Sequence, residues 1–305
     1  MAALMKMPER PLQDHLSVRK ILVPIVLAET SRHIIQQAAW LARRLHAEII
    51  LLHVVKPFNY PAGIFEAGDE ITAQDLTSRA VCQAQRNLDQ TLPPELHGVA
   101  LTRALLRGDP AREIVKAAFD RNVDLIMMST RGQAAFYRFL LGSVTAKVLH
   151  ESDCPVWTGA HLEDPTAGEF AVRNVLCSVD LSHHSYRTAA LAAQLATSLG
   201  AALTLVHITE SVGIYGPGGL RVDPAWEATI VGFATKEMDG LQQGVGTKAE
   251  VIIDSGNVLQ LIGESAARTH ADLLVIGHSP VHGHLGNNGN GYGIIRESRI
   301  PVLSV

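Results

Sequence analysis

The chain of 305 residues has little cysteine and no long apolar run, and each shortage excludes a class of protein. Its three cysteines, Cys82, Cys154 and Cys177, are odd in number and lack Cys-x-x-Cys spacing, which argues against a disulfide framework or a zinc knuckle. No apolar stretch reaches the roughly 20 residues that cross a bilayer, and the charged first segment is unlike a signal peptide. We therefore expect reduced thiols in a soluble, cytoplasmic protein without a membrane partner.

An excess of positive charge is also lacking. Lys and Arg number 26 against 30 Asp and Glu, which gives a net charge of −4. Nucleic-acid-binding surfaces are usually basic, so we expect no nucleic-acid partner. Hydrophobic residues, by contrast, make up 47% of the chain, enough for two packed domains at the usual ~100–200 residues each.

One sequence pattern occurs twice, and the two occurrences are called copy one and copy two. The offset between them is 154 residues at first, then 148, then 146, so copy two is shorter by a few residues in two connections. The matching segments are apolar runs typical of buried parallel strands. They are 21–26 with 175–180, 49–54 with 203–208, 124–128 with 272–276, and 154–156 with 300–302.

Helical patterns lie between these strands. Asp109 followed by Pro110 predicts a helix start, and further helices are expected over 72–91 and 226–243. Alternating strands and helices predict an α/β protein with two tandem, doubly wound, five-stranded parallel sheets of the Rossmann-like kind. The expected domains are 18–159 and 171–305.

A turn of small residues follows the fourth strand of copy one. Met127-Met128 runs into Ser129-Thr130-Arg131-Gly132, and Gly142-Ser143 opens a helix further on. Small residues let backbone N–H groups approach an anion, and a helix start adds further donors and the positive end of its dipole. The segment therefore predicts a cradle for phosphates.

This segment resembles a known signature. The spacing Gly-x2-Gly-x9-Gly-(Ser/Thr) after the fourth strand is similar to the ATP-binding motif of the universal stress protein family. The Ile-Leu-Val-Pro, Leu-His-Val, Gly-Asp-Pro and Cys-Pro-Val segments agree, and the resemblance covers both copies. It implies a tandem protein of that type with a role in the stress response. It also implies that copy one binds ATP or another adenine nucleotide, with Mg²⁺ as its companion.

The resemblance also implies roles for single residues. Gly132, Gly142 and Ser143 would hold the phosphates beside Val144, and Arg131 either contacts a phosphate or is solvated. Copy one departs from the motif twice: Ser129 replaces its first glycine, and Val26 replaces the Asp that ATP-binding members carry after strand one. The candidate nucleotide-binding residues are Val26, Val54, Met128, Ser129, Arg131, Gly132, Gly142, Ser143, Val144, Asp180 and Gly277.

Copy two departs from the motif in complementary places. It keeps Asp180 after its first strand and Gly277 as the first glycine, but Pro280 replaces the second glycine and removes a donor. Asn288-Gly289 stands opposite the Gly-Ser pair. We expect a degraded or repurposed pocket in this copy.

Three histidines on the altered loop suggest a second hypothesis. His278, His282 and His284 have spacing that could bind zinc or another transition metal, with Asp180 as a fourth ligand. The alternative is a solvated loop that diverged after phosphate binding was lost.

Other polar residues have structural interpretations. We expect His53 and His207, at the ends of the second strands, to pack near the pocket. Asp124 and Asp272 precede the fourth strands, where turn or cap roles are expected. The pair His183-His184 is expected at the surface where a helix begins.

Three functions remain open from the sequence. The first is a nucleotide-binding regulatory protein, the second a slow ATPase, and the third a scaffold without a nucleotide. A P-loop lysine and an acidic metal pair are not evident, so any hydrolysis should be weak. The resemblance implies an intramolecular pseudo-dimer through residues 155–159 and 301–305, and leaves a homodimer of two chains open.

Overall fold

The computed structural model describes residues 18–27, 31–57, 70–90, 94–130, 141–160, 170–209, 224–277 and 290–305. In copy one the described residues form nine main elements and a short 3-10 helix, η2 (Pro94–Leu96). The nine are β1 (Lys20–Pro24), α1 (Arg32–Leu45), β2 (Glu48–Val55), α2 (Glu70–Gln90), β3 (Leu101–Arg107), α3 (Pro110–Asp120), β4 (Leu125–Met128), α4 (Ser143–Glu151) and β5 (Val156–Thr158).

Copy two repeats the same order of elements. They are β6 (Asn174–Ser178), α5 (Ser185–Leu199), β7 (Ala202–Thr209), α6 (Pro224–Val245), β8 (Glu250–Ser255), α7 (Val258–Arg268), β9 (Leu273–Ile276), α8 (Asn290–Glu297) and β10 (Val302–Ser304). Helices α2 and α6 confirm the two long helices expected from the sequence, each within two residues at either end. Among the described residues, no helix combines the length and apolarity that a membrane span requires.

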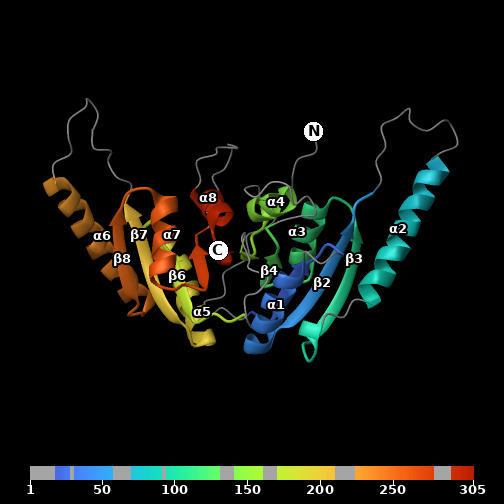
Figure 1. Cartoon of the computed structure of the whole chain (residues 1–305), viewed down its shortest axis with the longest axis horizontal. Helices are drawn as coiled ribbons and strands as arrows, with labels where there is room; N and C mark the ends of the chain where they lie inside the picture. The colour runs from blue at the N-terminus through green and yellow to red at the C-terminus, as the bar shows by residue number, and fades with distance from the viewer. Residues whose placement is uncertain are drawn as a thin grey trace.

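The strands form one sheet of ten, in the order β3-β2-β1-β4-β5-β10-β9-β6-β7-β8 (Figure 1). The five strands of each copy are parallel, and this confirms the doubly wound α/β class. Strand β5 pairs antiparallel with β10, so the two five-stranded arrays are continuous with each other. This β5–β10 pairing, called the seam below, removes an open edge from each copy, and unpaired edges invite aggregation.

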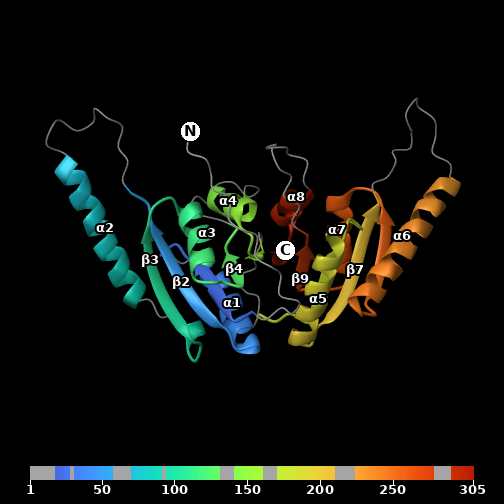
Figure 2. The ribbon, with the colours of Figure 1, turned by 180° about the vertical axis from the view of Figure 1, so that it is seen from behind.

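Helices cover both faces of the sheet, and each layer runs across the seam. One buried cluster joins α1, α2, α5 and α6 to alternate strand residues, and the other joins α3, α4, α7 and α8 to the remaining ones. Successive side chains of a strand point to opposite faces, which is why near-continuous apolar runs form these strands. Helices α2 and α6 lie at the far ends of the molecule, and the C-terminus lies near its middle (Figures 1 and 2).

Capping residues begin equivalent helices in the two copies. Asp109 accepts a hydrogen bond from the backbone N–H of Arg112 at 3.2 Å, and Pro110 is the first residue of α3. In copy two Asn257 accepts from the backbone N–H of Gln260 at 3.0 Å and begins α7. The predicted helix start at Asp109-Pro110 is thus confirmed, and its counterpart keeps the same geometry with a neutral side chain.

Two aspartates hold the starts of the central strands. Asp124 Oδ2 accepts from the backbone N–H groups of Arg19 and Lys20, both at 2.9 Å, where β1 begins. Asp272 Oδ2 makes the same pair of bonds at the start of β6, at 2.7 and 2.9 Å. Both aspartates lie at the amino-terminal edge of the sheet, so the expected structural role is confirmed.

The seam is built from different side chains on its two sides. Trp157 of β5 is fully buried, faces Leu303 of β10, and donates its indole N–H to Gln37 Oε1 at 2.8 Å. Its ring meets Phe170 edge-on, with 6.4 Å between ring centroids. Thr158 Oγ1 adds a hydrogen bond across the seam to the carbonyl of Val302, at 3.2 Å.

Candidate functional site

The start of α4 is tied to the exit of β4 by two hydrogen bonds. The backbone N–H of Gly142 donates to the carbonyl of Thr130 at 2.9 Å. Thr145 Oγ1 donates to the carbonyl of Ser129, also at 2.9 Å. Thr130 and Thr145 are buried, so both bonds are sheltered from water. The first turn of α4 is therefore fixed beside the carboxyl end of β4, where ligands bind in open α/β sheets.

This helix start presents donors rather than acceptors. Gly142 is the N-cap residue and contributes no side-chain cap, and the first turn of α4 contains no acidic residue. The first N–H groups of a helix have no partner within it, and the dipole adds partial positive charge. Ser143 is exposed and Val144 is half-buried. The arrangement suits an anion, and phosphate is one such anion.

The exit of β1 in copy one is closed by a serine and a histidine. Ser31 Oγ accepts from the backbone N–H of Val26 at 3.2 Å and donates to the carbonyl of the same residue at 3.1 Å. His53 Nδ1 donates to the carbonyl of Ile25 at 2.9 Å. The Val26 side chain is 36% exposed, and Val54 on β2 is half-buried. Ser31 and His53 thus bond the backbone at this corner of the site, and Val26 and Val54 add apolar side chains.

The same corner of copy two carries a carboxylate. Asp180 Oδ1 accepts from the backbone N–H of Ser182 at 3.0 Å and from Ser185 Oγ at 2.7 Å. Burial acts to raise the pKa of Asp180, but the hydrogen bonds from Ser185 and Ser182 outweigh it, and the pKa is lowered. His207 Nδ1 donates to the carbonyl of Val179 at 2.9 Å, as in copy one. The structural role expected for both strand-end histidines agrees with these bonds.

Backbone geometry around Asp180 is unusual. Leu181, which follows it, has a φ of 58°, in the left-handed region that side-chain-bearing residues rarely adopt. The neighbouring strand, β9, is followed directly by Gly277, where an added Cβ would lie 3.0 Å from Thr188 Oγ1 on α5. Because a side chain would crowd Thr188, glycine suits this close approach of β9 to α5. Asp180 and Gly277 follow neighbouring parallel strands, β6 and β9.

Several predicted site residues lie outside the described residues. Within the described ranges, no group of three or more His, Cys, Asp or Glu residues could hold a metal ion. His183 and His184 are both exposed where α5 begins, as expected, with 3.8 Å between ring centroids. The predicted site residues that lie outside the described ranges are Arg131, Gly132, His278, Pro280, His282, His284, Asn288 and Gly289.

Sequence reasoning missed some polar residues that shape the site. Ser31 and Ser185 correspond at the offset of 154, so the repeat itself indicates that the two serines share a role in the two copies. Thr145 lies one turn into α4, and only its side-chain bond to the β4 exit reveals its role.

Comparisons with known proteins agree on one family. The sequence model of the universal stress protein family matches the chain twice, over residues 17–158 and 171–305. A universal stress protein of Methanothermobacter thermautotrophicus is 36% identical over 142 residues, which cover 45% of this chain and 92% of that protein. One of Mycolicibacterium smegmatis is 30% identical over 193 residues, covering 62% of this chain and 63% of its own length.

Among solved structures, a universal stress protein of Archaeoglobus fulgidus aligns with a TM-score of 0.63 and 22% identity. The alignment covers 96% of this chain and 97% of that one. At this identity the similarity establishes the fold alone.

Proposed function

The chain belongs to the universal stress protein family, and we propose that its copy one binds an adenine nucleotide such as ATP in a regulatory role in the stress response. The observation that carries the proposal is the start of α4. Gly142, the N-cap residue, makes no side-chain cap bond to the first N–H groups, and bonds to the carbonyl of Thr130 and from the hydroxyl of Thr145 fix the turn in place. Such a turn can receive phosphates without reorganising, which lowers the entropic cost of binding.

Each end of the nucleotide has candidate contacts in copy one. The phosphates would meet Gly142, Ser143 and Val144 at the start of α4. Val26, Val54 and Met128 surround the expected position of the adenosine, and Ser129 lies between the two ends. Val26 offers apolar contact where a carboxylate would offer a hydrogen bond, so the base is held by packing. Arg131 and Gly132 remain proposed contacts on the strength of the sequence motif.

Mg²⁺ would bind at this site through ligands of the nucleotide rather than through protein side chains. The described residues at the start of α4 supply the hydroxyls of Ser143, Ser129 and Thr145, and the last of these already donates to a carbonyl. Mg²⁺ prefers several oxygen ligands, commonly substrate phosphates, water and one or two carboxylates. We therefore place Mg²⁺, where it accompanies ATP, on the phosphates and water.

Copy two serves in this proposal as a diverged partner domain. Asp180 and Gly277 persist there, but Asp180 Oδ1 is engaged by two donors of its own loop. The antiparallel seam supports an intramolecular pseudo-dimer of domains 18–159 and 171–305. A zinc site at His278, His282 and His284 is not part of the proposal, because all three residues lie outside the described ranges.

No catalytic residue is assigned. Phosphoryl transfer needs a positioned water, a metal and compensating positive charge, and the described residues at this turn supply only hydroxyls and N–H groups. Steady ATP turnover above the background of a loop variant would support the slow-ATPase alternative.

The proposal is tested by Gly142→Asp. Aspartate is a good N-cap and the φ of −58° at Gly142 suits any residue, so the variant should fold. Its carboxylate would, however, repel phosphates at the same N–H groups. We expect ATP affinity measured by calorimetry to fall at least about 100-fold, or roughly 2.7 kcal/mol. Asn288→Asp, the sequence counterpart in copy two, is the matched control and should bind ATP like the wild type.

A second candidate function is a scaffold that binds no nucleotide. The observation that favours it is Val26, which puts an exposed apolar side chain where a carboxylate is expected. Native mass spectrometry of the purified protein separates the two. An adenine nucleotide that co-purifies and is absent from Gly142→Asp supports nucleotide binding. No ATP binding by the wild type in calorimetry supports the scaffold.

A further inference from the structure

Helix α8 of copy two is anchored firmly on its own domain. Ile294 and Ile295 are buried in the cluster beneath it. At Gly293 an added Cβ would lie 2.9 Å from Leu259 Cδ2, so glycine permits close packing of α8 on α7. Helix α8 is therefore fixed on copy two, and so is the origin of any side chain that it directs away from this domain.

One side chain of α8 reaches across the seam to copy one. Tyr292 donates its hydroxyl to the carbonyl of Ala146 in α4, at 3.1 Å. Figures 1 and 2 show α4 and α8 on opposite sides of the middle of the molecule, at the same end of the sheet. Partial burial raises the pKa of Tyr292, so the phenol keeps its proton and donates at neutral pH.

The contact joins equivalent positions of the repeat. Tyr292 and Ala146 correspond at the offset of 146, as do Leu303 and Trp157, which face each other in the seam. Equivalent residues meet only near the local two-fold axis that relates the copies. A symmetric pair would make such a bond twice. Here alanine has no donor to return, so the bond runs only from copy two to copy one.

The bonded peptide group belongs to the turn that begins at the proposed phosphate site. Ala146 donates its backbone N–H to the carbonyl of Gly142 at 2.9 Å, while its own carbonyl receives Tyr292. A carbonyl has two lone pairs, so this bond adds to the helical one. The first turn of α4 is thus held from β4 by Gly142 and Thr145, and from copy two by Tyr292.

We infer that Tyr292 is a positioning residue, supplied by copy two, for the nucleotide site of copy one. The inference rests on the proposed function and adds a task for the diverged copy. Without the hydroxyl, the first turn of α4 loses its hydrogen bond to copy two and keeps its two bonds to the exit of β4. Binding must then order the turn further, and the affinity falls by that entropic cost. Tyr292 need not touch the nucleotide to have this effect.

The test is Tyr292→Phe, which keeps the ring and removes only the donor. Tyr186→Phe is a matched control, because Tyr186 also donates its hydroxyl to a carbonyl, that of Gly244 at 3.0 Å, but within copy two. Two readouts are needed: ATP affinity by calorimetry, and amide hydrogen exchange of residues 143–147 in the protein without ligand. We expect Tyr292→Phe to weaken ATP about 3- to 10-fold and to speed exchange, and Tyr186→Phe to change neither.

Three outcomes would overturn the inference. Unchanged exchange in Tyr292→Phe shows that the hydroxyl does not hold α4. Faster exchange with unchanged ATP affinity reduces Tyr292 to a structural contact. Equal effects from Tyr186→Phe show a general loss of stability. The proposed function fails if the wild type binds no ATP and if Gly142→Asp and the wild type show the same amide hydrogen exchange. Comparing amide exchange of residues 143–147 between Tyr292→Phe and the wild type then still decides whether Tyr292 restrains α4.

Discussion

In copy one Val26 lies two residues after the first strand, and in copy two Asp180 lies two residues after the equivalent strand, yet a serine five residues later serves both positions. Ser31 bonds the backbone of Val26, whereas Ser185 bonds the carboxylate of Asp180. The strand-end histidines make the same bond in both copies, at 2.9 Å. The comparison teaches that the backbone frame of this fold survives a change of chemistry at the ligand end of its strands.

The largest difference between the copies is expected at the seam. Trp157→Ala should lower the free energy of unfolding by about 3–5 kcal/mol, because it removes a large buried ring and leaves Gln37 without its indole donor. Leu303→Ala, at the equivalent position, should cost less, about 2–3 kcal/mol. Urea denaturation followed by circular dichroism gives both values. A cost for Leu303→Ala equal to or above that for Trp157→Ala contradicts the asymmetric seam.

The strand-start aspartates should behave alike. Asp124→Ala and Asp272→Ala each leave two backbone N–H groups without their acceptor, so each should cost about 1–2 kcal/mol in the free energy of unfolding. The same denaturation experiment measures them. Costs that differ by more than about 1 kcal/mol would show that the two aspartates do not stabilise their copies equally.

The charge of Asp180 should stabilise the fold only at pH values above its titration range. Its pKa is lowered in the folded protein, so the carboxylate stabilises the fold above the unfolded pKa of about 3.9. That contribution is lost as pH falls through the lower, folded value. Because Asp180 is exposed, solvent screens its charge, and Asp180→Asn, which keeps an acceptor, should cost under about 1 kcal/mol at pH 7. Val26→Asn is the matched control in copy one. A difference in the free energy of unfolding between Asp180→Asn and the wild type that persists below the folded-state pKa of Asp180 would refute the electrostatic explanation.

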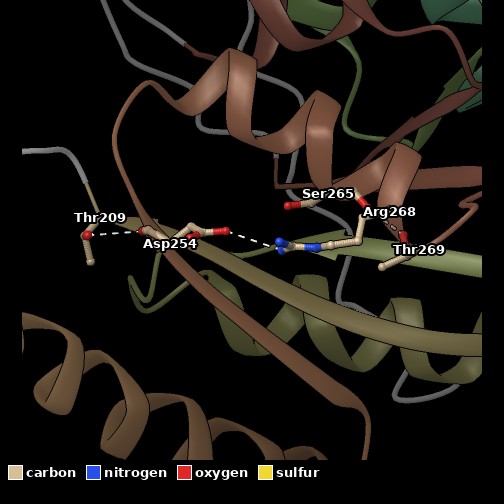
Figure 3. A network of polar contacts seen from close by, with 5 residues as sticks. All are labelled: Thr209, Asp254, Ser265, Arg268 and Thr269. Atoms are coloured by element: carbon tan, nitrogen blue, oxygen red, sulfur yellow. Dashed lines mark hydrogen bonds and ion pairs between the residues drawn. The ribbon is translucent and has the colours of Figure 1, made fainter.

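The smallest expected effect concerns a polar network of copy two whose ion pair is exposed (Figure 3). Asp254 Oδ2 lies 3.3 Å from a guanidinium nitrogen of Arg268, and Thr209 Oγ1 donates to the Asp254 carbonyl. Copy one has Leu106 and Asp120 at the equivalent positions. Because the pair is well exposed, Arg268→Ala should change the free energy of unfolding by about 0.5 kcal/mol or less. A loss above about 1 kcal/mol would mean that the network supports the edge of the sheet.

Local signals made much of the fold predictable. The apolar runs placed every strand of each copy except β3 and β8, and the Asp109-Pro110 pair placed the start of α3, because capping and burial act over a few residues. The repeat predicted the doubly wound topology twice. Gly142-Ser143 likewise identified the helix start that the structure places beside β4.

Contacts between distant residues were not predictable in the same way. The bond from Trp157 to Gln37 joins residues 120 positions apart, and the bond from Tyr292 to Ala146 joins residues 146 apart. Nothing in either local segment encodes its partner. The first bond depends on how β5 packs against α1 within copy one, and the second depends on how the two copies meet, whereas the sequence pattern describes only short segments.

The central claim is that the two copies are unequal and that only copy one binds a nucleotide. Calorimetric titration of the full chain with ATP tests it most directly, through the number of sites. The account predicts one ATP per chain, lost in Gly142→Asp and retained in Asp180→Ala. Two ATP per chain, or a single site that Asp180→Ala removes and Gly142→Asp leaves intact, would contradict it.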